Sequence, residues 1–232
     1  MIHIIRAKER HYSETDWLKT YWLFSFDDYY DPGNDGWGDL RVFNDDIIAP
    51  HSGFPMHPHK DYEIVTIILD GEITHADSAG HKGVTKAGEV QRMTAGSGVR
   101  HSEFNESDKP LHLYQIWIRP DRKGHTPSYE QKSFIKTSRK NKLLPVASGQ
   151  GKDDAISFNT DSTIFISEIS EGKTVQHKTD PSRKVLIYVT DGIIRIKNET
   201  LHPKDQARIE DEAEIDIAAT KSADIILIDV PT

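Results

Sequence analysis

Short runs of apolar residues alternate with turn residues along most of the chain. The run E-I-V-T-I-I-L ends at Asp70-Gly71, a dipeptide typical of hairpin turns. The segment L-R-V-F-N-D-D-I-I is interpreted as a strand, a turn at Asp45-Asp46 and a returning strand, and L-H-L-Y-Q-I-W-I (111–118) alternates in places with period two. Many short strands at close spacing are typical of a sandwich or closed barrel, not of a parallel sheet covered by helices. The pattern therefore predicts an all-β protein.

The alternation of short apolar strands and turns is interrupted once and then resumes. Residues 136–156 contain a basic stretch, Pro145 and S-G-Q-G-K-D-D, and are predicted to be a linker. Beyond them apolar strands recur, and one again runs into an Asp-Gly pair, Asp191-Gly192. This echo suggests a duplicated β-barrel unit. We predict an N-terminal domain over residues 1–135 and a C-terminal domain over residues 157–232.

Composition narrows the possible functions. The 232-residue chain has no cysteine, which excludes disulfides, cysteine zinc sites and thiol catalysis and fits a cytoplasmic location. The net charge is −8, and neither half offers the basic face that nucleic-acid binding requires. The N-terminus is charged where a signal peptide is apolar, and no apolar run is long enough to span a bilayer. We predict a cytoplasmic protein that binds neither nucleic acid nor membrane directly.

Two histidines flank one proline in G-F-P-M-H-P-H-K-D-Y-E-I (53–64). Pro58 biases His57 towards extended backbone and suits the start or edge of a strand, because it lacks an N–H. Residues two apart on a strand share a face, about 6.5 Å apart along the chain. His57 and His59 are therefore predicted to point to one side, where they can bind one metal ion. The isolated pair is equally well interpreted as two exposed polar residues, since the chain has 12 histidines.

A second pair follows in T-A-G-S-G-V-R-H-S-E-F-N (94–105), where His101 and Glu103 again lie two residues apart after a glycine turn. If this segment is also extended, two neighbouring strands offer three imidazoles and one carboxylate. Such donors suit Fe, Mn, Ni, Co, Cu or Zn, and four of them leave two positions free on a six-coordinate metal. Zinc held by the same four would be closed and structural. The predicted ligands are His57, His59, His101 and Glu103.

Two other polar residues belong to the same pattern. Without a bulge, strand parity places Glu63 on the face of His57 and His59, and Asn105 on the face of His101. Either could hold an imidazole N–H or a bound water. Glu63 is also the alternative carboxylate ligand, but we favour Glu103 because its strand already carries a ligand.

These spacings resemble the two motifs of the cupin superfamily. His57, His59 and Glu63 match H-x-H-x3-E, and His101 and Asn105 match H-x3-N, whereas Thr94 stands where the second motif has a proline. The departures are similar to those of the pirin branch. Pirin-like segments run in order through the first 120 residues: W-L-F-S-F-D-D-Y-Y-D-P, G-D-L-R-V-F-N-D-D, G-F-P-M-H-P-H-K-D-Y-E-I, M-T-A-G-S-G-V-R-H-S-E and L-H-L-Y-Q-I-W-I.

The resemblance implies a bicupin fold, two stacked β-barrels of the double-stranded β-helix or jelly-roll type. It implies one divalent transition metal in the N-terminal barrel, bound by the same four residues that the spacing selected. The C-terminal barrel has only His177 and His202, with no H-x-H or H-x-E. It is predicted to be a degenerate cupin domain without metal that packs against the first barrel and closes its pocket.

Pirins span two classes of function. Bacterial pirin-like proteins resemble quercetin 2,3-dioxygenases, which open flavonols with dioxygen, whereas eukaryotic pirins resemble nuclear iron-binding cofactors of transcription factors. We predict a dioxygenase that acts on a flavonol such as quercetin. Fe(II) is the favoured metal, and Zn, Mn, Ni, Co or Cu are alternatives. Glu103 is the predicted base, with Glu63 in reserve. The alternative is a non-catalytic iron-binding module, read by a protein partner.

The remaining histidines and aromatic residues are given structural roles. Histidines without a partner at ligand spacing are interpreted as surface or structural: His51, His75, His81, His112 and His125. An early group of aromatic residues could line a flavonoid pocket, although core packing is preferred: Trp22, Phe24, Phe26, Tyr29 and Tyr30.

Overall fold

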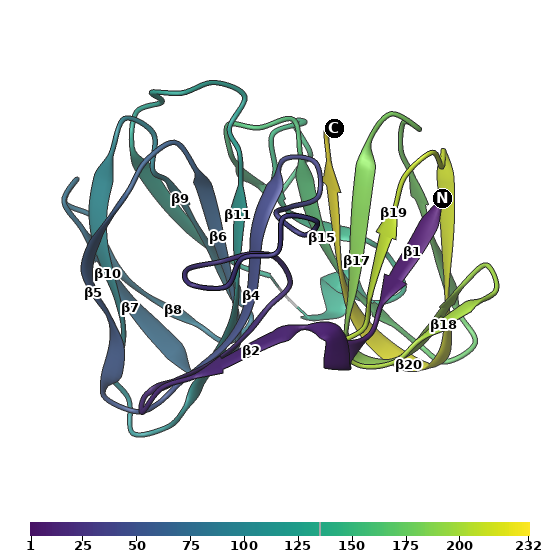
Figure 1. Ribbon diagram of the computed structural model, residues 1–232, viewed down its shortest axis with the longest axis horizontal. Helices are drawn as coiled ribbons and strands as arrows, with labels where there is room; N and C mark the ends of the chain where they lie inside the picture. The colour runs from purple at the N-terminus through teal and green to yellow at the C-terminus, as the bar shows by residue number, and fades with distance from the viewer. Residues whose placement is uncertain (135) are drawn as a thin grey trace.

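The computed structural model describes residues 1–134 and 136–232, and almost all of its regular structure is β-strand. Figure 1 shows two barrels side by side, the first purple to teal and the second green to yellow. The all-β, two-barrel prediction is confirmed. Short 3₁₀ helices, η1 (Ala7–Glu9) and η2 (Lys136–Arg139), join strands. No helix within the described ranges is long and apolar enough to cross a membrane.

The first barrel consists of two antiparallel sheets. The larger sheet has the order β12-β9-β6-β11-β4-β3-β2, and the smaller has the order β5-β10-β7-β8. The bounds are β2 (His11–Glu14), β3 (Leu18–Trp22), β4 (Leu40–Ile48), β5 (Ser52–His59), β6 (Glu63–Asp70), β7 (Glu72–Asp77), β8 (Lys82–Lys86), β9 (Glu89–Thr94), β10 (Val99–Asn105), β11 (Leu111–Ile118) and β12 (Ser128–Ser133).

The second barrel takes in the first strand of the chain. β1 (Ile2–Ile5) pairs with β19 (Gln206–Ile209), and Figure 1 shows the N-terminus on the second barrel before the chain crosses through β2. The predicted N-terminal domain, residues 1–135, counts β1 with the first barrel, because pairing across more than 200 residues leaves no local signal in the sequence. The other strands are β13 (Leu144–Ser148), β14 (Ile156–Ser157), β15 (Thr163–Ile169), β16 (Thr174–Lys178), β17 (Lys184–Ile196), β18 (Glu199–Leu201) and β20 (Glu214–Val230).

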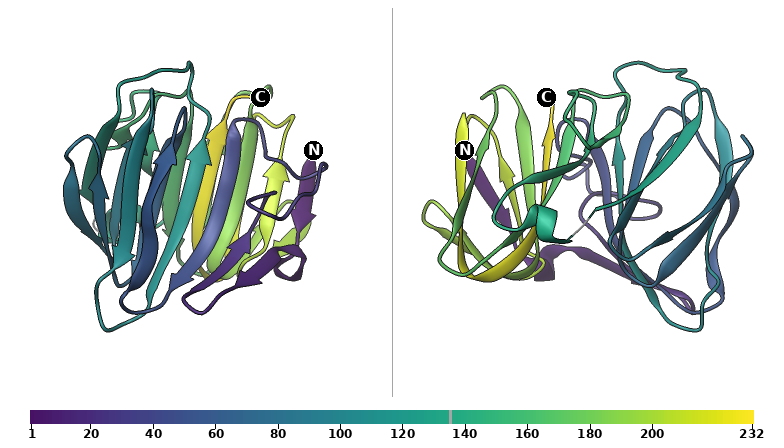
Figure 2. Two further views of the ribbon diagram at one scale, coloured as in Figure 1. Left: turned by 60° about the vertical axis from the view of Figure 1, so that its left-hand side comes forward. Right: turned by 180° about the vertical axis from the view of Figure 1, so that it is seen from behind.

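The segment predicted as a linker, residues 136–156, is partly built into the second barrel. β13 lies within it and pairs antiparallel with β15, and Val146 and Ala147 are fully buried. Pro145 sits beside a register shift, where a missing N–H is tolerated. Figure 2, seen from behind, shows η2 and the strands that follow it between the two barrels. Proline and glycine here accompany a short strand and do not exclude one.

The two Asp-Gly pairs do not form hairpins. Gly71 has φ +82° and lies between β6 and β7, which belong to different sheets, so the chain turns a corner there. Gly192 has φ +79° and lies inside the long strand β17, at a register shift opposite β20. At Gly71 the left-handed backbone that glycine allows turns the chain from one sheet to the other, and at Gly192 it bends a strand that stays paired with β20. The echo noticed in the sequence is therefore a repeated bend and not a repeated hairpin.

The predicted turn at Asp45-Asp46 is wrong, because both residues lie within the continuous strand β4 and are buried. Strand alternation sends their side chains in opposite directions. Asp45 meets Tyr188 of the second barrel, and Asp46 meets Thr20 inside the first. These partners satisfy two carboxyl groups that would otherwise be costly to bury in a strand.

The largest hydrophobic cluster lies between the barrels, not inside either one. It joins Phe43 and Tyr114 of the first barrel to Leu186, Tyr188 and Ile228 of the second. The alternate residues of β17 and β20 fill the interior of the second barrel with Ile, Val and Leu. Because both faces of these strands are covered, they are continuous apolar runs. The interior of the first barrel instead has two smaller apolar clusters.

Candidate metal site

The smaller sheet of the first barrel brings the predicted ligands together. In β10, the burial alternates so that Val99, His101, Glu103 and Asn105 all face inward. His101 pairs directly with His57 of β5. A register shift between His101 and Glu103 makes Glu103 pair with Phe54. Such a bulge re-aims side chains locally, and it sits at the centre of the site.

The rings of His57, His59 and His101 form a compact group. Their ligand nitrogens lie within 4.8 Å of one another. The His57 and His101 Nε2 atoms are 3.0 Å apart, and the His57 ring lies edge-on to that of His59 at 4.7 Å. The His57 Nδ1 lies 2.7 Å from the Pro55 carbonyl, an acceptor, so Nδ1 carries the proton and Nε2 presents its lone pair.

Two of the three histidines, His59 and His101, are held in the neutral state. Burial, together with the neighbouring imidazoles, lowers the pKa of His59 to about 3 and that of His101 to about 3. Desolvation disfavours the imidazolium, and a second positive charge nearby disfavours it further. Neutral imidazoles with free lone pairs are the form that binds transition metals. The donor set therefore fits a divalent metal on chemical grounds.

Glu103 belongs to a second, overlapping group with His101 and His75. Its Oε1 accepts a hydrogen bond from Gln91 Nε2 at 2.6 Å, and its Oε2 accepts one from Gln115 Nε2 at 2.8 Å. The amide of Gln115 can point only this way, because its oxygen accepts from the indole N–H of Trp117 at 3.1 Å. Two amides thus fix the carboxylate beside the histidines, and each oxygen keeps a further lone pair.

Glu63 lies elsewhere. It begins β6 in the larger sheet, after Asp61 with φ +54° has broken the strand, so the parity argument from His57 and His59 does not apply. Its Oε2 accepts from the Thr94 hydroxyl at 2.9 Å and its Oε1 from Asn159 Nδ2 at 3.0 Å. Burial raises its pKa. The carboxylate joins the first barrel to a loop of the second.

Asn105 faces inward as expected but serves the loop that follows β10. Its Nδ2 donates to the carbonyls of Ile48, Ala49 and Lys109, and its Oδ1 accepts from the Ser107 amide. All five histidines given structural roles lie beside carboxylates: His51 beside Asp108, His75 and His81 beside Asp77, His112 beside Asp45 and His125 beside Asp121. In the second barrel, His177 bonds Asp229 at 2.7 Å. The predicted lack of a metal there stays a prediction.

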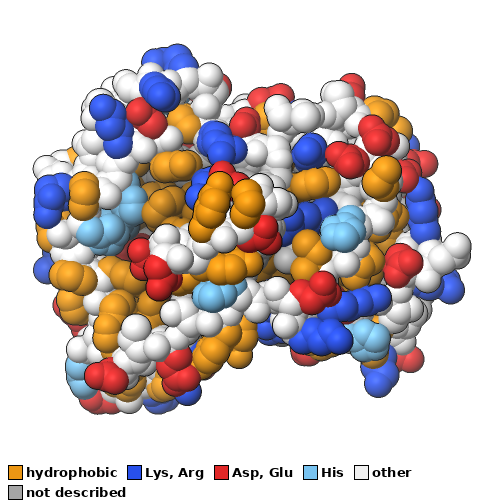
Figure 3. Space-filling view, in the orientation of Figure 1, with side chains coloured by type: hydrophobic (Ala, Val, Ile, Leu, Met, Phe, Trp, Pro, Cys, Tyr) orange, Lys and Arg blue, Asp and Glu red, His pale blue; other side chains and the backbone are white. Residues whose placement is uncertain are grey.

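A cavity of about 560 Å³ opens onto the histidine group. Its lining combines three of the predicted ligands with apolar and polar residues: Leu18, Thr20, Trp22, Phe26, Asp27, Asn44, Asp46, Phe54, His57, His59, Glu103, Gln115 and Trp117. Cavities of roughly 300–1,000 Å³ hold small-molecule ligands. Figure 3 shows histidine side chains at the surface of the first barrel among hydrophobic ones.

The early aromatic group divides between two roles. Trp22 and Phe26 line the cavity and contact each other edge-on at 5.3 Å, whereas Phe24 packs in the hydrophobic cluster between the barrels. Tyr29 stacks on His11, and Tyr30 is exposed. Trp22 is buried, as the preference for core packing expects, and also forms part of the cavity wall, whereas the partly buried Phe26 lines the cavity, because alternation on β3 and the loop after it turn both side chains inward.

Sequence reasoning missed two residues at the site. His75 is fully buried beside His101, although it was given a structural role. Trp117 lies edge-on to His59 with ring centres 4.7 Å apart. Alternation in E-I-T-H-A-D and in L-H-L-Y-Q-I-W-I could have placed both side chains inside the barrel. Only the strand register shows what they contact.

Two stacked barrels, with histidines and a carboxylate inside the first, define a bicupin. Residues 5–118 match the family Pirin, and residues 145–230 match the quercetinase C-terminal cupin domain. The chain belongs to the pirin family.

Full-length relatives agree with this assignment. The chain is 39% identical to quercetin 2,3-dioxygenase of Escherichia coli, over 100% of this chain and 99% of that protein. It is 44% identical to a pirin-like protein of Caulobacter vibrioides over 92% of each chain. A solved bacterial pirin from Escherichia coli, in complex with nickel(II), superposes with a TM-score of 0.94 at 38% identity, covering 100% of this chain and 99% of that one.

Proposed function

We propose that this protein is a metal-dependent dioxygenase of the quercetin 2,3-dioxygenase type, acting on a flavonol in the first barrel. The observation that carries the proposal is the cavity of about 560 Å³ that reaches His57, His59 and Glu103. A ring-sized ligand therefore has access to the histidine group. The names of the relatives support the same activity.

His57, His59, His101 and Glu103 are the residues that would hold the metal. Fe(II) is our preferred ion, because imidazole and carboxylate donors suit it. A related bacterial pirin was solved in complex with nickel(II), so another divalent ion is the alternative. When bound, the metal supplies Lewis-acid and dioxygen chemistry. Glu103 is the proposed base: one of its oxygens takes the proton of the flavonol 3-hydroxyl, while Gln91 and Gln115 keep the carboxylate in place.

The cavity walls suit a flat polyphenol. Trp22, Phe26 and Trp117 provide aromatic faces and edges, and Phe26 meets Trp117 edge-on at 5.5 Å. Thr20 and Asp46 add buried polar groups on the same wall. Aromatic walls bind the rings, and a few polar groups orient the hydroxyls.

The alternative is a non-catalytic, metal-bound module whose surface is read by a protein partner. Both functions would use the same ligands, so the ligands cannot distinguish them. An accessible cavity favours the enzyme, because a module needs no space for a ring-sized substrate. We also propose a cytoplasmic location, which a chain without cysteine fits.

The test is dioxygen consumption when quercetin is added to protein loaded anaerobically with Fe(II). We expect oxygen uptake, ring opening and carbon monoxide from wild type, and none from His57→Ala. Absence of uptake in protein with confirmed bound metal would favour the binding module.

A matched pair of variants tests the assignment of the base. Glu103→Gln should retain part of the metal and lose at least about 100-fold in turnover, the size of a general-base contribution. Glu63→Gln should retain most activity, because Glu63 bonds Thr94 and Asn159 away from the cavity lining. Full activity of Glu103→Gln would remove its assigned role.

A further inference from the structure

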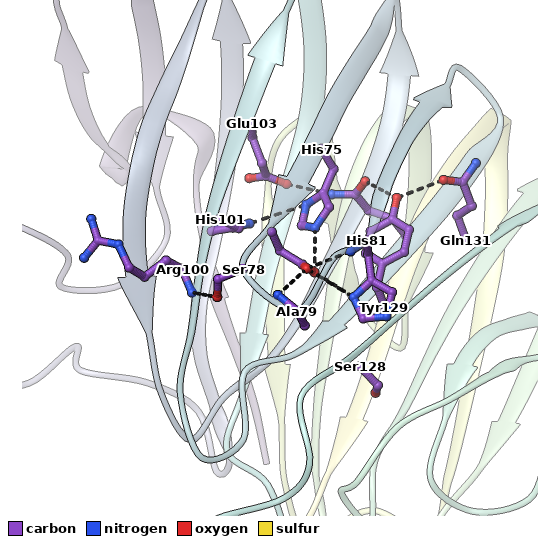
Figure 4. A network of polar contacts seen from close by, with 12 residues as sticks. His75, Ser78, Ala79, His81, Arg100, His101, Glu103, Ser128, Tyr129 and Gln131 are labelled. Carbon is purple, nitrogen blue, oxygen red and sulfur yellow. Dashed lines mark hydrogen bonds and ion pairs between the residues drawn. The ribbon is translucent and has the colours of Figure 1, made fainter.

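His75 is a fully buried histidine next to the proposed ligands. It lies in β7, opposite Glu103 and diagonal to His101 in the register of the sheet. The Nδ1 atoms of His75 and His101 are 3.5 Å apart, and Figure 4 shows His75 between His101 and Tyr129. A buried imidazole must satisfy its nitrogens among such neighbours.

The far side of the His75 ring contacts a carboxylate. Its Nε2 lies 3.2 Å from Asp77 Oδ2. The other oxygen of Asp77, Oδ1, accepts from the backbone amides of Ala79 at 2.9 Å and His81 at 3.0 Å. Since a carboxylate only accepts hydrogen bonds, the His75 Nε2 carries the ring proton. The Nδ1 of a neutral His75 then directs a lone pair at His101.

The orientation of His75 is also fixed by packing. Its ring stacks on Tyr129 with centres 4.4 Å apart and an angle of 21° between planes. The Tyr129 hydroxyl in turn donates to Gln91 Oε1 at 3.1 Å, and Gln91 donates to Glu103. The groups that fix the ring plane of His75 are therefore linked to those that hold the proposed carboxylate ligand, Glu103.

His101 completes the chain of hydrogen bonds. Its Nε2 faces the His57 Nε2, so Nε2 is the ligand atom and the proton of its ring lies on Nδ1. We propose that His75 is a positioning residue for the metal site: its Nδ1 accepts a hydrogen bond from the Nδ1–H of His101, and, held by Asp77, it keeps the His101 Nε2 directed at the metal site. This inference rests on the proposed metal centre. Loss of such an outer hydrogen bond typically weakens metal binding about 10–100-fold.

Two substitutions at residue 75 separate positioning from packing. In His75→Asn, the side-chain oxygen can occupy the place of Nδ1 and still accept from His101. In His75→Gln, the amide reaches the place of Nε2 and Asp77, but no acceptor faces His101. Packing alone predicts that Gln, nearer to His in size, is the milder change. We expect the reverse for metal binding.

A third variant leaves the packing almost unchanged. In Asp77→Asn, the oxygen must still accept from the amides of Ala79 and His81, so its NH₂ faces the His75 Nε2. His75 must then carry its proton on Nδ1, against the N–H of His101. We expect Asp77→Asn to weaken metal binding as His75→Gln does.

The experiment measures Ni(II) affinity by competition with a chelator, and the visible absorption of Co(II)-loaded protein. We expect His75→Gln and Asp77→Asn to lose about tenfold or more in affinity and to shift the Co(II) bands. His75→Asn and the exposed control His51→Gln should stay within a few-fold of wild type. Circular dichroism of the metal-free proteins checks that each variant is folded.

Three outcomes would overturn the inference. The first is a pattern of affinities that does not follow the acceptor at residue 75. Either His75→Gln and Asp77→Asn both keep wild-type affinity, or His75→Asn loses as much affinity as His75→Gln. The second is a second Ni(II) ion that disappears with His75→Gln, which would make His75 a ligand. In the third, wild type binds no Ni(II), and the proposed metal centre fails together with the inference.

Discussion

Asp46 is a carboxyl group on the cavity wall that is almost fully buried. Burial is the main cause that raises its pKa to about 7, and the nearby charges of Asp45 and Glu103 act in the same direction, against the hydrogen bond from Thr20. Near neutral pH the group therefore keeps its proton in a large share of molecules. A protonated carboxyl can donate a hydrogen bond to a substrate oxygen, as the ionised form cannot.

The raised pKa of Asp46 predicts a pH-dependent stability difference between wild type and Asp46→Asn. Between about pH 4 and 7, folded wild type holds a proton that the unfolded chain has lost, so its unfolding free energy falls as the pH rises. The amide of Asp46→Asn does not titrate. The stability of the variant relative to wild type should therefore rise by up to about 1.4 kcal/mol per pH unit across this window and level off above it.

Urea denaturation of both metal-free proteins at about pH 5, 6, 7 and 8 measures this difference. Subtracting the unfolding free energy of one protein from that of the other cancels the contribution of every other titrating group that behaves alike in both. A difference that is constant with pH would mean that Asp46 has an ordinary pKa in the folded state.

At the residue scale, the sequence could point to the proposed ligands because their spacing is local. His57 and His59, like His101 and Glu103, are two apart on strands, and alternation alone places each pair on one face. His75 and Glu63 show where this reasoning ends. The role of His75 depends on the pairing of β7 with β10. Glu63 lies in a different sheet from His57 and His59, because the left-handed backbone at Asp61 ends the extended segment between them.

At the element scale, the site depends on how closely β5 approaches β10. Gly53 lies in β5, and a Cβ at this position would come within 2.6 Å of Phe104 Cα, closer than real side chains come. Only a glycine lets the two backbones pack at this distance. Because His57 and His101 pair across the same two strands, their separation depends on that contact.

We therefore expect Gly53→Ala to weaken Ni(II) binding about tenfold or more, since forcing β5 outward moves His57 from His101. Gly33→Ala is the matched control, because a Cβ there meets only Asp31 Oδ1 at 3.4 Å and should leave affinity unchanged. Chelator competition measures both. Wild-type affinity in Gly53→Ala would mean that the strands can separate without disturbing the ligands.

Strands and turns were predictable from the sequence where neighbouring residues determine the backbone. They were missed where residues far along the chain determine it. Glycine after Asp70 and after Asp191 correctly marks an unusual backbone, but whether it closes a hairpin or bends a strand depends on the neighbouring strands. The pair Asp45-Asp46 has the composition of a turn. It lies in a strand because buried partners far along the chain satisfy both carboxyl groups.

At the scale of the whole molecule, a buried polar network crosses the interface between the barrels at Asp45. Its Oδ1 lies 2.7 Å from His112 Nε2, and its Oδ2 accepts from the Tyr188 hydroxyl at 2.9 Å and from Arg10 at 3.1 Å. The side chains of Arg10 and Asp45 are only 7% and 5% exposed. Tyr188 belongs to the second barrel, whereas Asp45 and His112 belong to the first.

Removing one partner of such a network should lower the unfolding free energy by more than the intact network adds to it, because the other partner stays buried without its counter-charge. Asp45→Ala leaves the Arg10 guanidinium buried without its carboxylate, and breaking a buried ion pair in this way typically costs about 3–5 kcal/mol. Asp108→Ala, which removes an exposed carboxylate beside His51, should change the unfolding free energy by less than about 1 kcal/mol. Urea denaturation measures both. Equal stabilities of the two variants would mean that water replaces the carboxylate beside Arg10, so that this network adds nothing measurable to the contact between the barrels.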